Sequence, residues 1–242
     1  MQLGMTKISK HKIIAISGLK NTGKDTTASM LVFCKNNPKF LHYYWIYKLF
    51  PHLCIKRNWE KVSFAHSLKG MLAVLLKIHP EAFEDRIFKE NYCVDFSTLK
   101  ILKKEDCDRT LTDSRFSKFI KDESISLTRD CLTIRQLMQY FGTEIMRDFF
   151  GDKIWCLSTL QASELNNIVI SDLRFKTEAN EVKKRRGLLI CINRPGTIPG
   201  NHISEREVIE LQNNGQFDFT IENNGTLKNL FNKVKELNKH VG

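Results

Sequence analysis

Two glycines and a lysine near the start of the chain stand in an order that suits phosphate binding. Residues 18–24 read Gly-Leu-Lys-Asn-Thr-Gly-Lys, which is the G-x-x-x-x-G-K pattern. Glycines let the backbone wrap with successive N–H groups pointing inward, and a helix beginning there adds its positive end. Lys24 would then reach the β- and γ-phosphates of a nucleotide. The alternative is a turn that happens to hold two glycines.

Asp25 stands where such loops usually carry a serine or threonine that binds magnesium, and Thr26 follows it. Asp25 could hold the ion directly or through water, or Thr26 could supply the hydroxyl, and the sequence leaves this open. A further alternative is that Asp25 only places negative charge on the first helical turn. The residues assigned to the nucleotide phosphates in this segment are Gly18, Asn21, Thr22, Gly23, Lys24, Asp25 and Thr26.

Polar residues recur at every fourth position further along, at Arg135, Gln139, Thr143 and Arg147. In a helix this spacing places them on one slowly drifting stripe. An arginine can bind a phosphate with two hydrogen bonds and a glutamine can pair with a base edge, although an ordinary solvated helix face looks the same. Gly142 in this helix costs about 1 kcal/mol against alanine, which indicates that something packs close to the backbone there.

Asp172 and Arg174 follow a short apolar strand. Ligands of open parallel sheets bind at the carboxyl ends of the strands. An aspartate there commonly orients magnesium and an arginine can stabilise a transferring phosphoryl group, whereas a turn closed by Asp172 is the alternative. Trp155 is more often a core residue, but it could stack on a base. Further on, Ser204 and Glu207 fit a capping box that would begin a helix.

Short apolar strands alternate with amphipathic helices along the chain, which predicts an α/β fold with a five-stranded parallel sheet and helices on both faces. The strands are expected at residues 11–17, 61–65, 167–171, 188–192 and 217–221. The helices are expected at residues 24–35, 67–76, 133–149 and 177–186, with a last one capped by Thr226.

Two segments do not follow this alternation. Residues 36–60 are rich in aromatic and basic side chains, and residues 80–130 are charged with little periodicity. We interpret both as helical or irregular insertions at the ligand-binding edge that form a substrate lobe. Because there is no repeat and no flexible linker, residues 1–242 are predicted to be one domain, with a mobile lid near 195–203.

Lysine and arginine (38) exceed aspartate and glutamate (27) by 11, which favours polyanionic partners such as nucleic acid or phosphorylated small molecules. The longest aliphatic run, residues 71–76, is too short to span a membrane, and no secretory signal is predicted at the start. Seven scattered cysteines match no disulfide framework. We therefore expect a cytoplasmic protein without a membrane partner, and leave monomer or homodimer open.

Taken in order, these motifs resemble the deoxynucleoside monophosphate kinases of tailed bacteriophages. The resemblance covers residues 12–34 and about 133–234, and is weak over 36–130 apart from Phe64, Ala65 and Lys69. The resemblance rests on the loop with Asp25 in place of Ser/Thr, Arg135 to Gln139, Gly142 to Glu144, Trp155, Asp172 to Arg174, Glu178, Arg194 to Gly196, His202 to Glu205 and Asn224 to Leu227.

The resemblance implies a P-loop kinase-like fold that uses ATP and Mg²⁺ to phosphorylate deoxynucleoside monophosphates. In this reading Arg194 joins the ATP-binding residues, Asp25 and Asp172 serve the metal, and Lys24, Arg135, Asp172 and Arg174 act in catalysis. The residues assigned to the monophosphate are Lys20, Lys69, Arg135, Gln139, Gly142, Thr143, Trp155, Arg174 and Glu178.

Two alternatives stay open on the sequence. One is a P-loop kinase acting on another phosphorylated small molecule, such as a phosphomevalonate-type substrate. The other is a nucleotide-gated nucleic-acid-binding protein that uses the basic, aromatic residues 40–60 to stack bases. For the kinase that we predict, nucleic acid is not required.

Overall fold

The computed structural model describes residues 12–45, 58–96, 98–106, 131–162, 166–200 and 202–241. The chain divides into two compact units. The first unit combines residues 1–64 with residues 156–242, and the second unit consists of residues 65–155. Each unit has a sheet and helices of its own.

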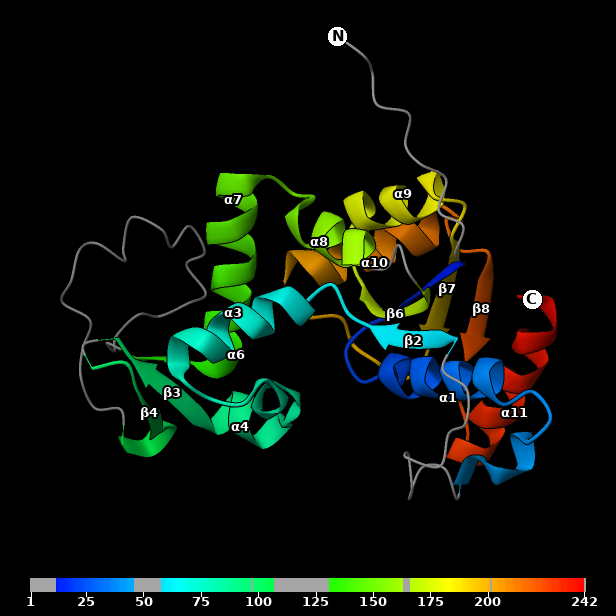
Figure 1. The fold of residues 1–242 in the computed structure, drawn as a ribbon, viewed down its shortest axis with the longest axis horizontal. Helices are drawn as coiled ribbons and strands as arrows, with labels where there is room; N and C mark the ends of the chain where they lie inside the picture. Colours follow the sequence, from blue (N-terminus) through cyan, green and yellow to red (C-terminus); the bar gives the residue numbers. More distant parts are fainter. Residues whose placement is uncertain are drawn as a thin grey trace, which may run out of the picture. The chain divides into compact units, whose positions relative to one another are not determined.

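The first unit is built on a five-stranded sheet in which every neighbouring pair of strands is parallel (Figure 1). The strand order is β2-β6-β1-β7-β8, and β1 in the centre is buried along its whole length. This confirms the predicted α/β class. The strands are β1 (Ile13–Ser17), β2 (Trp59–Val62), β6 (Asn167–Leu173), β7 (Leu188–Asn193) and β8 (Phe219–Glu222).

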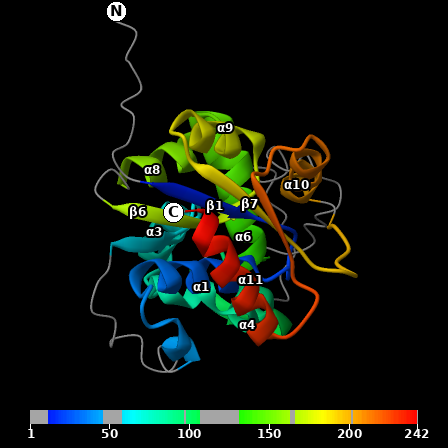
Figure 2. The ribbon, with the colours of Figure 1, turned by 90° about the vertical axis from the view of Figure 1, so that its right-hand side faces the viewer.

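Helices cover both faces of this sheet, as Figure 2 shows. Helices α1 (Lys24–Asn36) and α11 (Leu227–His240) lie on one face, and α8 (Ile154–Ala162) and α9 (Lys176–Lys184) lie on the other. Helix α10 (Ile203–Asn213) packs beside α9. Apolar side chains of β1, α1 and α11 form the main core on the first face. Burial of this surface is what stabilises the layers.

The predicted helix and strand boundaries are mostly within two residues of the observed ones, with one informative error at α10. This helix begins at Ile203, and the Nδ1 atom of His202 accepts a hydrogen bond from the N–H of Ser204. The predicted capping box of Ser204 and Glu207 is therefore wrong. Glu207 instead accepts a hydrogen bond from the N–H of Lys176, at 2.7 Å.

The second unit contains a small sheet that the sequence did not predict, because its strands are short and their charge pattern is irregular. Its three antiparallel strands have the order β4-β3-β5. The unit comprises α3 (His66–Leu76), a 3₁₀ turn (Pro80–Glu84), α4 (Arg86–Asn91), β3 (Tyr92–Asp95), β4 (Lys100–Lys103), a second 3₁₀ turn (Lys104–Asp106) and β5 (Cys131–Thr133), followed by a long helix. The rest of the predicted 80–130 insertion, residues 107–130, lies outside the described part.

The long helix is interrupted by a wider turn around Gly142. It consists of α6 (Ile134–Tyr140), a π-helical segment (Phe141–Ile145) and α7 (Met146–Phe150). A side chain at Gly142 would put its Cβ only 2.9 Å from Cδ2 of Leu68, and the Gly142 carbonyl accepts a hydrogen bond from Nε1 of Trp155 at 2.8 Å. The close approach predicted at Gly142 is confirmed.

The aromatic segment at 36–60 contributes to the core of the first unit where it is described. Tyr44 and Trp59 are buried, and the ring of Tyr44 stacks on Phe231 of α11 with centroids 4.4 Å apart. Aromatic rings buried in this way are not available to stack on bases, and residues 46–57 lie outside the described part. Across the ranges that are described, no helix combines the length and the apolar character needed to span a membrane.

Candidate active site

The predicted site residues fall into two groups, one in each unit. The first unit carries the loop between β1 and α1 together with residues at the carboxyl ends of β6 and β7. We call residues 18–24 the phosphate loop, after the prediction; its last residue, Lys24, is also the first residue of α1. The second unit carries Lys69, Arg135, Gln139, Thr143 and Trp155, with Gly142 between them.

Close contacts with neighbouring segments explain the two glycines of the phosphate loop. A Cβ at Gly18 would lie 2.5 Å from the carbonyl oxygen of Ile192 on β7. Gly23 has φ +97°, and a Cβ there would lie 2.7 Å from Nδ2 of Asn223. Larger residues would therefore displace the loop from β7 at one end and from the segment after β8 at the other.

Lys24 is the buried cation of this loop. Only 7% of the residue is exposed, and its Nζ donates a hydrogen bond to the carbonyl of Leu19 at 3.1 Å. The pKa of Lys24 is lowered to about 8, chiefly by burial and also by the nearby Arg174, whereas Asp25, Glu205 and Asp172 act to raise it. Negative charge that binds beside this ammonium would favour its protonated form.

Asp25 and Thr26 differ in their surroundings at the start of α1. The Asp25 side chain is 69% exposed, and its Oδ1 lies 3.5 Å from Nζ of Lys61 on β2. The Lys61 ammonium therefore pairs with this carboxylate when no metal ion is bound. Thr26 is half-buried, and the next residue, Thr27, donates its hydroxyl hydrogen to the carbonyl of Gly23 at 3.0 Å.

Asp172 and Glu178 both accept hydrogen bonds from backbone N–H groups. Oδ1 of Asp172 accepts one from Phe64 at 2.7 Å, which ties the end of β6 to the segment after β2. The buried carboxylate of Glu178 accepts two, from Arg174 at 2.9 Å and from Phe175 at 3.1 Å. Glu178 thereby caps the first turn of α9.

The guanidinium of Arg174 is directed to the beginning of α10. Its Nη1 donates to Oγ of Ser204 and to Oε1 of Glu205, both at 3.3 Å. Arg194, at the end of β7, is exposed, and its carbonyl accepts a hydrogen bond from the N–H of Thr197 at 3.2 Å. The first unit therefore brings Lys24, Asp172 and Arg174 into one charged cluster, with Arg194 at the strand end.

In the second unit the two predicted cationic side chains each pair with an acid. Nζ of Lys69 on α3 lies 2.6 Å from Oε1 of Glu84, and Nε of Arg135 donates to Oε1 of Glu90 on α4, also at 2.6 Å. About a third of the Arg135 side chain remains exposed. Both acids would have to share their partner with an incoming phosphate.

The polar stripe predicted along the long helix is not uniform. Gln139 is exposed, whereas Arg147 is buried, and Thr143 lies in the π-helical segment where the spacing changes. Trp155 is 5% exposed, with its indole N–H bound to the Gly142 carbonyl. Its observed contact supports the helix backbone.

Sequence reasoning assigned no role to two residues that contact the phosphate loop. Glu205 accepts a hydrogen bond from the N–H of Lys20 at 3.1 Å, and Asn223 donates from Nδ2 to the carbonyl of Thr22 at 2.8 Å. Both are buried polar side chains. Two signals were available: Glu205 ends a segment on which the resemblance rests, and Asn223 follows the last predicted strand, at the carboxyl edge.

Replacement of Asn223 by alanine is expected to destabilise the chain by about 1–2 kcal/mol and to weaken ATP binding, because a buried carbonyl of the loop loses its donor. Urea unfolding and calorimetric ATP titration would measure the two effects. Asn224→Ala is the matched control, since Asn224 is exposed and accepts a hydrogen bond from Lys233. Equal effects of the two variants would contradict this role for Asn223.

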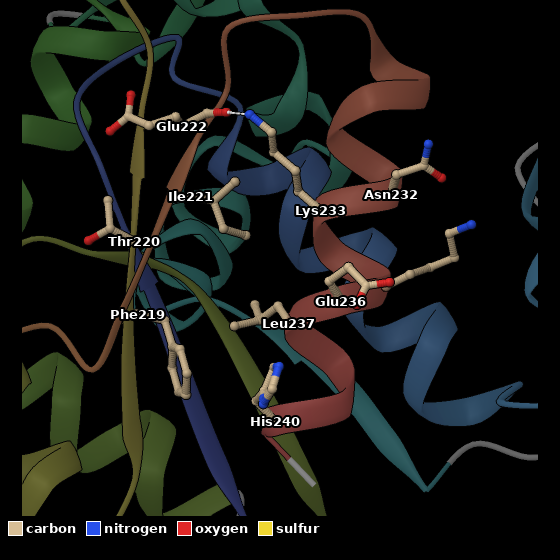
Figure 3. Close-up of a pocket in the computed structure, with 10 residues that line it drawn as sticks. Phe219, Thr220, Ile221, Glu222, Asn232, Lys233, Glu236, Leu237 and His240 are labelled. Atoms are coloured by element: carbon tan, nitrogen blue, oxygen red, sulfur yellow. Dashed lines mark hydrogen bonds between the residues drawn. The ribbon is translucent and has the colours of Figure 1, made fainter.

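A hollow of about 550 Å³ lies between β8 and α11 (Figure 3). Phe219, Ile221 and Leu237 supply its apolar wall, and Lys233 and Glu236 lie on its helical side. None of its lining residues is among the predicted site residues. In the described part of the chain, no group of three or more His, Cys, Asp or Glu residues is arranged to hold a metal ion.

Comparison with known proteins agrees with the resemblance seen in the sequence. The profile of the deoxynucleotide monophosphate kinase family matches residues 76–234. The deoxynucleotide monophosphate kinase of Escherichia phage RB69 is 24% identical over 257 aligned residues, which cover 93% of this chain and 99% of that protein. A protein of Acanthamoeba polyphaga mimivirus, named as a candidate deoxynucleotide monophosphate kinase, is 29% identical over 117 residues, 42% of this chain and 59% of its own length. The chain therefore belongs to the deoxynucleotide monophosphate kinase family, a family of phosphotransferases.

Proposed function

We propose that the protein transfers the γ-phosphoryl group of ATP to a deoxynucleoside monophosphate. A phosphate oxygen of the monophosphate attacks the γ-phosphorus, the bond to the β–γ bridging oxygen breaks, and ADP leaves with a deoxynucleoside diphosphate. No covalent enzyme intermediate is needed, so catalysis rests on positioning and on charge stabilisation.

The observation that carries this proposal is the burial of Lys24 in the phosphate loop, in a chain of this family. Arg174 and Asp172 lie near enough to Lys24 to interact with its charge. Lys24 and Arg174 would stabilise the negative charge spread over the transferring group. Arg135 and Lys69 would bind the acceptor phosphate. The phosphomevalonate-type and nucleic-acid-binding alternatives are not favoured by the family membership.

A coupled assay of ADP release over the four common deoxynucleoside monophosphates and their ribose counterparts tests the proposal. We expect turnover with one or more deoxynucleotides and slower turnover with the matching ribonucleotides. Absence of turnover with every monophosphate, from a folded protein that binds ATP, would contradict it.

Asp25, Thr26 and Asp172 offer the hard oxygen ligands that Mg²⁺ prefers, which fits a magnesium-dependent reaction. Bound Mg²⁺ would neutralise charge on the β- and γ-phosphate oxygens. Asp25 is the better candidate ligand, because its exposed carboxylate stands where such loops usually carry the hydroxyl ligand, and Mg²⁺ would replace the Lys61 ammonium beside it.

Asp25→Asn is expected to raise the magnesium concentration needed for half-maximal turnover about tenfold, since a hard cation prefers the charged oxygen. Thr26→Val is the comparison variant, and we expect it to do less harm. Magnesium titrations of turnover for both variants would measure this. An unchanged curve for Asp25→Asn would mean that the carboxylate only supports the helix end, and a larger effect of Thr26→Val would assign the ligand to the hydroxyl.

A further inference from the structure

Glu205, in the first turn of α10, connects three segments of the first unit that lie far apart in the sequence. Its carboxylate accepts hydrogen bonds from the N–H of Lys20 in the phosphate loop at 3.1 Å and from Nη1 of Arg174 at 3.3 Å. The N–H of Gly200, in the loop before α10, lies 3.5 Å from its other oxygen. The residue is only 6% exposed.

A buried carboxylate is costly unless charged and polar partners compensate for the lost water. The partners of Glu205 are a guanidinium and two backbone N–H groups, so its oxygens have strong donors on several sides. Ser204, its neighbour in the same turn, accepts from the same Nη1 atom of Arg174. The beginning of α10 therefore fixes the direction in which Arg174 points.

Glu205 contacts the phosphate loop at the N–H of Lys20 and not at the first turn of α1, where the nucleotide phosphates are expected to bind. The N–H groups of a helix's first turn have no acceptor within the helix, and these are the groups that bind phosphate at helix N-termini. Glu205 binds the loop ahead of them, at Lys20, between the two glycines. Glu205 thus supports the part of the phosphate loop that lies between the two glycines.

We infer that Glu205 is a positioning residue for phosphoryl transfer, which holds the Arg174 guanidinium and the phosphate loop in the arrangement that receives the nucleotide phosphates. This inference rests on the proposed function. Glu205 acts through Arg174 and the loop, and it takes no proton and forms no bond in the reaction.

The loop that Glu205 holds is the loop that contains Lys24. Nζ of Lys24 donates to the carbonyl of Leu19, the residue before Lys20, and the N–H of Lys20 donates to Glu205. Loss of the Glu205 charge should therefore weaken ATP binding as well as turnover.

The test compares Glu205→Gln, which keeps the shape and removes the charge, with Glu210→Gln as control. Glu210 is an exposed residue of the same helix and pairs with Lys176. Calorimetric ATP titrations at neutral pH, kcat and thermal melting are the measurements. For Glu205→Gln we expect kcat to fall about tenfold and ATP binding to weaken about tenfold, whereas Glu210→Gln should match the wild type.

A folded Glu205→Gln variant with wild-type kcat and wild-type ATP affinity would overturn the inference. If that variant fails to fold, Glu205→Asp carries the test: its side chain keeps the charge but is too short to reach Arg174, which should lower kcat. An unchanged kcat in Glu205→Asp would overturn the inference in that case. If the wild type turns over no monophosphate, the proposed function fails, but the ATP affinity of the variants still tests Glu205 on its own.

Discussion

Replacement of Lys24 by methionine is expected to lower kcat at least a hundredfold, or about 3 kcal/mol of transition-state stabilisation. Methionine keeps the length of the side chain and removes the ammonium. The physical reason is the place of this charge: the residue is 7% exposed, and its Nζ is held by the Leu19 carbonyl inside the loop. Water cannot replace a charge buried there, so the loss falls on the transition state.

Steady-state kinetics with ATP and the best monophosphate would measure this effect, and circular dichroism would check the fold. Lys35→Met is the matched control, because it removes an ammonium from the other end of the same helix, where Nζ binds the Val241 carbonyl. That control should keep its kcat even where its stability falls. A folded Lys24→Met protein with near-normal turnover would exclude the phosphate-loop assignment.

Arg135→Lys is expected to raise the KM for the monophosphate about thirtyfold and to change the KM for ATP little. Lysine keeps the charge but cannot form two parallel hydrogen bonds to a phosphate, and loss of a charge-assisted bond costs about 2 kcal/mol. Arg135 lies in the second unit, paired with Glu90 through Nε, whereas the phosphate loop lies in the first unit. The two substrates should therefore respond separately.

Initial-rate measurements with each substrate varied in turn would give both KM values. Arg86→Lys is the control, since Arg86 is an exposed residue at the beginning of α4 and carries no predicted role. Equal rises in both KM values for Arg135→Lys would instead identify a structural arginine that holds Glu90.

The five parallel strands and most helices of the first unit could be predicted because strands and helices alternate along the chain there and the helices show their own period. Helix α11 is the clearest case: Leu230, Phe231, Val234 and Leu237 are all buried, and Thr226 caps it as predicted. The three strands of the second sheet could not be predicted, although β2 and β8 are as short, since they lie in or next to a charged stretch with little periodicity and their pairing depends on distant segments.

The beginning of α10 shows how a tertiary contact overrides a local sequence rule. Ser204 and Glu207 have the spacing of a capping box, but His202 caps the helix, and Glu207 binds the first turn of α9. The acceptor chosen by each side chain depends on which helix lies next to it, and that is a tertiary property.

By itself, the sequence predicted the phosphate loop of this protein and indicated its fold class and its family, because Gly18, Gly23 and Lys24 lie within seven positions of the chain and their pattern needs no distant partner. Which residues hold that loop in place was decided only by the tertiary structure. Asn223 reaches Thr22 across 201 positions, and Glu205 reaches Lys20 across 185. The local periodicity of a sequence does not indicate contacts between residues so far apart. Such contacts arise because parallel strands bring their carboxyl ends to one edge of the sheet.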